Sequence, residues 1–169
     1  SRDEIEYGQS REITHEKILP VVSKRSYDQG KNWEKTMQVT AYDIMGNPVE
    51  IKRDDGRTAV YIWGYAGQHI VAEIKNTTLK TVKEKCPELG NMKDIPLPGE
   101  LPSGIEKSLR SIPNAPVTTW KYIPFVGCIQ MTDASGRSTG YTYDSSGRLA
   151  AIYDTEGHVL KTFEYNMGY

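Results

Sequence analysis

The chain has 169 residues, with 21 basic and 22 acidic side chains and a formal net charge of −1. This length predicts one domain, residues 1–169, with a core large enough to fold without cross-links. The balanced charge, and the lack of a Lys/Arg cluster interleaved with aromatic residues, argue against a nucleic-acid partner. No apolar run approaches the length of a membrane span and no signal segment opens the chain, so the sequence predicts a soluble protein.

The residue types favour β-structure, because 11 Tyr and 3 Trp stand beside only 2 Phe, with 15 Gly and 9 Pro. Tyr, Trp, Thr and Val suit a half-exposed strand, and Gly and Pro suit turns. We therefore expect a mainly β protein, an antiparallel meander of hairpins with a two-helix insertion. The expected divisions are a β block at 1–75, a helical insertion at 76–113 and a β block at 114–169.

The first β block contains several stretches with strand composition, separated by turn signals at 27–30, 43–46 and 54–56. One stretch, 58–65, is apolar on both faces, which predicts a central strand buried on two sides. The expected strands of this block lie at 18–23, 37–42, 49–53, 58–65 and 70–74.

Helical spacing then replaces strand alternation. Leu79, Val82 and Cys86 recur on one helical face, and they predict a helix over about 77–86, with Asn76 or Thr77 as its cap. Because a short helix is not stable alone in water, we expect its apolar side to lie on the sheet.

A second helix is expected after a loop rich in Pro and Gly. Ser103 and Glu106 have the spacing of a capping box, and the apolar residues that follow predict a helix over about 104–112. Pro113 ends this helix because proline cannot continue one.

The second β block repeats a short phrase, Asp-x-x-Gly, after an aromatic residue or Thr. The aspartate can accept a backbone N–H two residues on, and the glycine can take a left-handed conformation that a Cβ would penalise. Such a turn closes a β-hairpin, and strands are expected at 138–143, 148–153 and 158–165. The expected turn residues, including one earlier copy, are Asp43 and Gly46, Asp133 and Gly136, Asp144 and Gly147, and Asp154 and Gly157.

The phrase that runs from Tyr143 through Asp144 to Gly147, Arg148 and Leu149 resembles the YD repeat of the Rhs and wall-associated protein superfamily. More narrowly, residues 37–165 are similar to the carboxy-terminal Rhs-like region of large surface or secreted proteins from Bacteroidetes. The resemblance implies an extracellular or cell-surface location and a structural or adhesive role within a longer polypeptide. Wider members build spiral β-sheet shells that sometimes enclose a toxin, so part of such a shell is a distant alternative. The chain has about three clean repeats and lacks the core-associated motif, a departure from that pattern.

Catalysis and metal binding have little support in the sequence. Asp133, Asp144 and Asp154 could act as paired carboxylates or as Ca²⁺ ligands, but each occupies a position where a turn requires such a residue. His158 takes a turn position filled by Arg or Asn in the other copies, which indicates a solvated side chain. No nucleophile elbow, P-loop or zincin motif occurs, so we expect no enzyme activity, no cofactor and no metal.

Carbohydrate binding is the main alternative to a purely structural role, because flat aromatic faces suit sugar rings. Trp33 stands among polar residues and is expected to be exposed, whereas Trp63 is expected in the core. The candidate ligand-binding residues are Trp33, Trp120 and Tyr141.

Two further questions remain open at the level of sequence. Cys86 and Cys128 could pair or stay as separate small apolar residues. The last strand, 158–165, would leave an unpaired edge, which neighbouring repeats of the same polypeptide, an early strand such as 18–23, or a second copy of the chain could cover. An edge-mediated homodimer is therefore expected, and Ser1 at the start fits a processed chain or a piece of a longer one.

Overall fold

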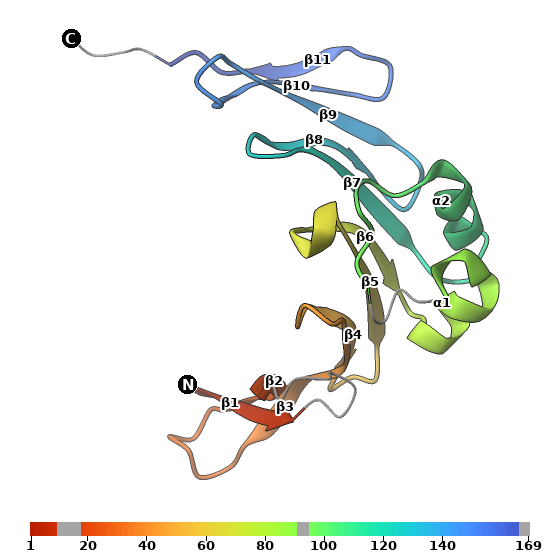
Figure 1. Ribbon diagram of the computed structural model, residues 1–169. Helices are drawn as coiled ribbons and strands as arrows, with labels where there is room; N and C mark the ends of the chain where they lie inside the picture. The colour runs from red at the N-terminus through yellow and green to blue at the C-terminus, as the bar shows by residue number, and fades with distance from the viewer. Residues whose placement is uncertain (10–17, 91–94, 166–169) are drawn as a thin grey trace.

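The computed structural model describes residues 1–9, 18–90 and 95–165, and within them 11 strands form a single sheet. The strands follow one another in chain order, and Figure 1 shows them as a curved row from β1 to β11. Each strand pairs antiparallel with the next, which confirms the predicted fold class. The strands are β1 (Arg2–Gln9), β2 (Ile18–Ser26), β3 (Glu34–Tyr42), β4 (Pro48–Arg53), β5 (Thr58–Gly64), β6 (His69–Lys75), β7 (Val117–Ile123), β8 (Gly127–Thr132), β9 (Ser138–Tyr143), β10 (Leu149–Tyr153) and β11 (Val159–Thr162).

The sheet has two open edges within the described residues. There, β1 pairs with β2 alone and β11 with β10 alone. β2 lies between β1 and β3, so the early strand does not reach the late ones. β11 is shorter than the expected 158–165, and its side chains are exposed. The backbone N–H and C=O groups along an open edge can pair with a further strand.

Two short helices lie between β6 and β7, on the outer side of the curve in Figure 1. They are α1 (Leu79–Lys85), followed by the 3₁₀ turn η2 (Pro87–Leu89), and α2 (Ser103–Arg110). Their apolar side chains pack on the central strands, as the sequence predicts. The fully buried side chains of this core include Val60, Ile62, Val71, Ile74, Val82 and Leu109. None of the helices in the described ranges is long and apolar enough to cross a membrane.

The helices cover only one face of the sheet. On β5, Val60 and Ile62 are 0% exposed and point to this helix-covered face, whereas Tyr61 and Trp63 are only partly buried. The expectation that this strand is buried on both sides is therefore wrong, because the described residues place both helices on the same side. We call the other side the open face; Ala59, Tyr61 and Glu73 lie on it.

Trp63 of β5 is neither fully buried nor exposed. It is half-buried rather than part of the fully buried core, and its indole Nε1 donates a hydrogen bond to the Pro48 carbonyl at 2.8 Å. This bond ties β5 to the start of β4.

Helix α1 begins two residues later than expected. Thr78, rather than Asn76 or Thr77, is its N-cap, and the Thr78 hydroxyl accepts the Thr81 N–H at 3.3 Å. The Leu79 N–H, another free donor of the first turn, donates to Glu50 Oε2 at 2.6 Å. The sheet therefore supplies part of the helix cap, a contact that local sequence cannot indicate.

Helix α2 begins without the predicted capping box. Pro102 is the N-cap residue and no side chain caps it, so Ser103 is the first helical residue rather than the cap. Glu106 instead turns toward the sheet, where its Oε1 accepts hydrogen bonds from Arg110 Nε at 3.0 Å and Thr119 Oγ1 at 3.2 Å. The capping-box expectation is wrong because the helix begins at Ser103, one residue early, so Ser103 is not at the N-cap position that the box requires.

Candidate functional site: the Asp-x-x-Gly turns

The four repeated turns share one hydrogen-bond pattern. In each, the aspartate Oδ1 accepts the backbone N–H groups of the second and fourth following residues, at 2.8–2.9 Å. The glycine N–H donates to the aspartate carbonyl at 2.9–3.1 Å. The glycines have φ of 75–90°, a conformation that a Cβ disfavours. The turns comprise Asp43 and Gly46, Asp133 and Gly136, Asp144 and Gly147, and Asp154 and Gly157.

The second carboxylate oxygen is also engaged in three of these turns. Oδ2 contacts the side chain of the fourth residue onward, which is Asn47 at 3.0 Å, Arg148 at 2.9 Å or His158 at 3.1 Å. In the Asp133 turn, the Ser135 hydroxyl donates instead to Oδ1 at 2.7 Å. The carboxylates are thus held by their own turns, which is the arrangement of a structural residue rather than of a free base.

These contacts lower the pKa values of three carboxyls. The largest cause at Asp133 is the Ser135 hydroxyl, and at Asp144 and Asp154 it is the backbone N–H of the fourth following residue. Hydrogen bonds to the charged form favour it, so the ionised turn is the stable one.

The Asp43 turn differs because it lies inside the molecule. Asp43 is 1% exposed, and Asn47 Nδ2 also donates to the Gly67 carbonyl at 3.1 Å. Gly67 ends the tight turn η1 (Tyr65–Gly67) between β5 and β6, so this bond joins two neighbouring hairpin ends.

Among the described residues, two related turns lack the full pattern. At the expected turn 54–56, Arg53 occupies the aspartate position: its N–H donates to the Arg57 carbonyl at 2.8 Å and its own carbonyl accepts the Gly56 N–H at 3.0 Å. Between β2 and β3, Asp28 accepts the N–H groups of Lys31 and Asn32 at 3.1 and 2.9 Å, in a wider loop than the turn expected at 27–30. In the first turn the Arg57 N–H is accepted by Asp55 Oδ1 at 2.9 Å, so a carboxylate at another position supplies part of the pattern.

Sequence reasoning missed Arg110, which connects helix α2 to the repeats by hydrogen bonds. Arg110 Nη1 donates to the carbonyls of Val117 at 3.0 Å and Asp133 at 2.9 Å, and its Nε donates to Glu106. This contact links α2, β7 and the first C-terminal turn. The i,i+4 spacing of Glu106 and Arg110 signals their ion pair, but nothing in the sequence signals the two carbonyls.

The three candidate ligand-binding aromatic residues do not form one cluster, because Trp33 precedes β3, which is not a neighbour in the sheet of the strands that carry the other two. Trp33 lies in the loop before β3 and is 38% exposed, as expected, whereas Trp120 and Tyr141 are partly buried on β7 and β9. Trp120 pairs with Met131 and Met131 with Thr139, so Trp120 and Tyr141 lie on the open face. Ligand binding by these residues stays a prediction.

The remaining candidates are placed as follows. Cys86 is buried and Cys128 half-buried, and both are free thiols. His158 has 70% of its side chain exposed, as expected for a turn residue. Across 1–9, 18–90 and 95–165, no group of three or more His, Cys, Asp or Glu side chains is arranged to hold a metal ion.

Comparison with families of known proteins identifies one segment. The RHS Repeat family matches residues 128–159, the stretch from β8 to the first residue of β11 that contains three of the four turns. None of the curated proteins compared with the chain matches it.

Solved structures give a broader but weaker likeness. The chain is 11% identical to a chain in the crystal structure of TcdB2-TccC3-Cdc42, and the alignment covers 95% of this chain and 8% of that one, with a TM-score of 0.49. The crystal structure of TcdB2-TccC3 without the hypervariable C-terminal region gives the same values. The Photorhabdus luminescens Tc holotoxin pore with mutant TccC3 gives 10% identity, the same coverage and a TM-score of 0.45. This chain thus spans a small part of each matched chain, and what those proteins do does not carry over to it. The finding that bears on this chain is that its C-terminal hairpins match an RHS repeat.

Proposed function

We propose that the chain is a non-catalytic structural module of a secreted or cell-surface protein with RHS repeats, a piece of β-sheet that neighbouring repeats of the same polypeptide lengthen. The observation that carries this proposal is the strictly consecutive strand order with an open edge at β11. In a repeat array each unit contacts mainly its neighbours, and the end units need further repeats or caps.

The match to the RHS Repeat supports the same reading, because it covers the hairpins of β8 to β10 beside that edge. The extracellular location, the adhesive role and the kinship with wall-associated proteins of Bacteroidetes are parts of this proposal. They rest on the resemblance of the repeats.

The test is to lengthen the array within the full chain. A second copy of residues 133–153, which begins at one turn aspartate and ends before another, is inserted between Tyr153 and Asp154. We expect a folded protein with more β-structure by circular dichroism and a melting temperature at least as high as that of the parent. An insert of the same composition in scrambled order is the control, and it should form no added strands. Loss of cooperative unfolding with the ordered insert would contradict the proposal.

Carbohydrate binding is the second candidate, favoured by the placement of Trp120 and Tyr141 on the open face. A glycan array probed with the folded chain tests it, with Trp120→Ala as the matched variant. A glycan bound by the parent and lost in the variant supports binding, whereas an array without any hit removes this candidate.

A further inference from the structure

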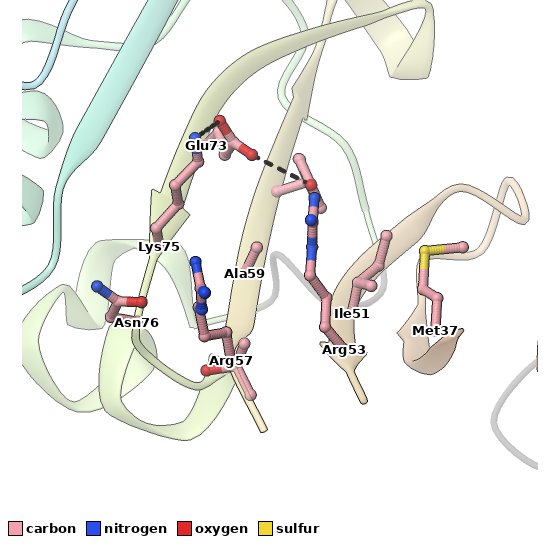
Figure 2. A pocket seen from close by; sticks show the side chains of 10 residues that line it. Met37, Ile51, Arg53, Arg57, Ala59, Glu73, Lys75 and Asn76 are labelled. Carbon is pink, nitrogen blue, oxygen red and sulfur yellow. Dashed lines mark hydrogen bonds and ion pairs between the residues drawn. The ribbon is translucent and has the colours of Figure 1, made fainter. Parts of the chain in front are cut away.

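A cavity of about 240 Å³ lies on the open face between β3 and β6, strands that Figure 1 shows apart from the C-terminal hairpins of β8 to β11. Figure 2 shows it from close by, with Ala59 of β5 at its centre and Ile51 and Met37 to one side. A cavity of this volume suits a small molecule or one unit of a larger one.

The hollow follows from the side chains that meet across three strands. Ile51 of β4 pairs with Ala59, and Ala59 pairs with Lys75 of β6, so a single methyl group stands between two longer side chains. Met37 and Ile51 add apolar surface beside it. A ligand that entered here would rest its apolar part on these three residues.

The charges around the cavity do not cancel. Lys75 Nζ lies 3.4 Å from Glu73 Oε2, and Arg57 Nε lies 2.9 Å from Asp55 Oδ2, so two of the three cations already have carboxylate partners. The guanidinium of Arg53, which also lines the cavity, forms no ion pair or hydrogen bond with a side chain of the described residues. The residues that line the cavity comprise three cations and one carboxylate, Glu73, and Arg53 is the cation without a carboxylate partner among the described residues.

The Arg53 charge affects the hydroxyl group of Tyr61, which also lines the cavity. The Tyr61 hydroxyl donates to Glu73 Oε1 at 3.2 Å, and burial raises the pKa of this hydroxyl, with Glu73 adding to the rise and Arg53 opposing it. The positive charge of Arg53 therefore lies close enough to act electrostatically on a group that lines the cavity. A guanidinium is well suited to a carboxylate, because its parallel N–H groups match the two carboxylate oxygens.

We propose that this cavity binds a small organic carboxylate, with the carboxylate on Arg53 and the apolar part on Met37, Ile51 and Ala59. The proposal is independent of the role of the sheet as a repeat module. Such a group could come from a free aromatic acid or from the uronic acid unit of a polysaccharide, since both combine a carboxylate with an apolar surface.

The test is an NMR titration of the full chain with 3-phenylpropionate and with glucuronate, beside the neutral 3-phenylpropionamide. At least one acid should shift the amide signals of Ala59 and Tyr61, more strongly than the amide does. Arg53→Gln should weaken binding about threefold to fivefold, the upper part of the range for one exposed charge pair. Ala59→Leu should abolish binding because its side chain fills the hollow.

Lys52→Gln is the matched control, because it removes the same charge from the neighbouring position of β4, whose side chain points to the opposite face. Binding to this variant should stay within about twofold of the parent, since surface changes remote from the contact have small effects. If Ala59→Leu does not fold, the comparison of Arg53→Gln with Lys52→Gln decides the question. The proposal is overturned if neither acid binds, if the neutral amide binds equally well, or if Arg53→Gln binds as the parent does.

Discussion

Two parts of one continuous sheet are stabilised in different ways. In β5 to β7, alternate side chains are fully buried beneath α1 and α2, as Val60, Ile62 and Ile74 are. From β8 to β11, Ala151 is the one buried residue among those described. Neighbouring strands are antiparallel in both parts, so strand direction does not create the difference; the helices inserted between β6 and β7 do.

Polar contacts take the place of a core in the C-terminal part. The Tyr143 hydroxyl donates to the Cys128 carbonyl at 2.7 Å, and the Tyr165 hydroxyl to the Leu149 carbonyl at 3.0 Å. The Arg148 guanidinium lies 4.5 Å from the Tyr165 ring centre, in addition to its bond with Asp144. The comparison teaches that a repeated hairpin can be held by turns and tyrosines, provided that another part of the sheet supplies the buried apolar surface.

The largest expected effect is the loss of a core side chain. Leu109→Ala removes a fully buried side chain from α2, and we expect the free energy of unfolding to fall by about 2–5 kcal/mol. Urea denaturation monitored by circular dichroism measures it. Leu160→Ala is the control on β11, where the side chain is 61% exposed, and its effect should stay within about 0.5 kcal/mol. Equal losses in both variants would contradict the division of the sheet.

A smaller effect is expected from a repeat turn. Gly147 has φ of 75° and no atom within 4 Å of an added Cβ, so Gly147→Val acts through backbone strain and not through a clash. We expect a loss of about 1–3 kcal/mol, with faster hydrogen exchange concentrated in β9 and β10. Gly104→Ala in α2, also free of near neighbours, should change stability by less than about 1 kcal/mol. An unchanged melting temperature for Gly147→Val would argue against this role of the turn glycine.

The smallest expected effect is the loss of stability of the repeat turns at low pH. The turn carboxyls have lowered pKa values in the folded protein, so their contribution is present above the unfolded pKa of about 3.9 and is lost as the pH falls through the lower folded pKa. The pKa of Asp28 is lowered to about 2, chiefly by the Asn32 N–H, so its contribution persists furthest into acid. Below pH 4 we expect the C-terminal hairpins to lose hydrogen-exchange protection before β5 and β6 do.

Asp144→Asn is the control for this pH dependence, because the amide cannot titrate in this range. The stability difference between the parent and this variant should shrink between about pH 4 and pH 2. A difference that is constant over this range would show that the Asp144 carboxylate contributes nothing through its charge.

Much of the fold can be predicted from the sequence because its determinants are local. Asp-x-x-Gly contains both the acceptor and the left-handed residue that its turn needs, and the strands between the turns follow by default. The two helices are likewise found from the spacing of Leu79 and Val82 and of Ile105 and Leu109. The predicted ends of a strand are less accurate where no such signal marks them, as at β11. β1, β7 and β8 lie inside the expected β blocks, but the sequence predicts no limits for them.

The contacts that could not be predicted join residues far apart in the chain. Glu50 on the N–H of Leu79, and Arg110 on the Asp133 carbonyl, depend on where the helices settle on the sheet. The same placement decides that one face of β5 is covered and the other is open. The cavity beside Arg53 therefore has no sequence signature, since it is formed by Ala59 standing between longer neighbours on adjacent strands.

The consecutive strand order also constrains how the length of such a protein can change. Successive hairpin turns lie at alternate ends of the sheet, so with 11 strands the chain enters at one end and leaves at the other. Gain or loss of a single strand would make the chain leave the last strand at the opposite end of the sheet, and a segment attached there would start from the wrong place. Gain or loss of two strands keeps the exit where it was. Duplication in even numbers of repeats is therefore the change that this architecture accommodates without rebuilding its surroundings.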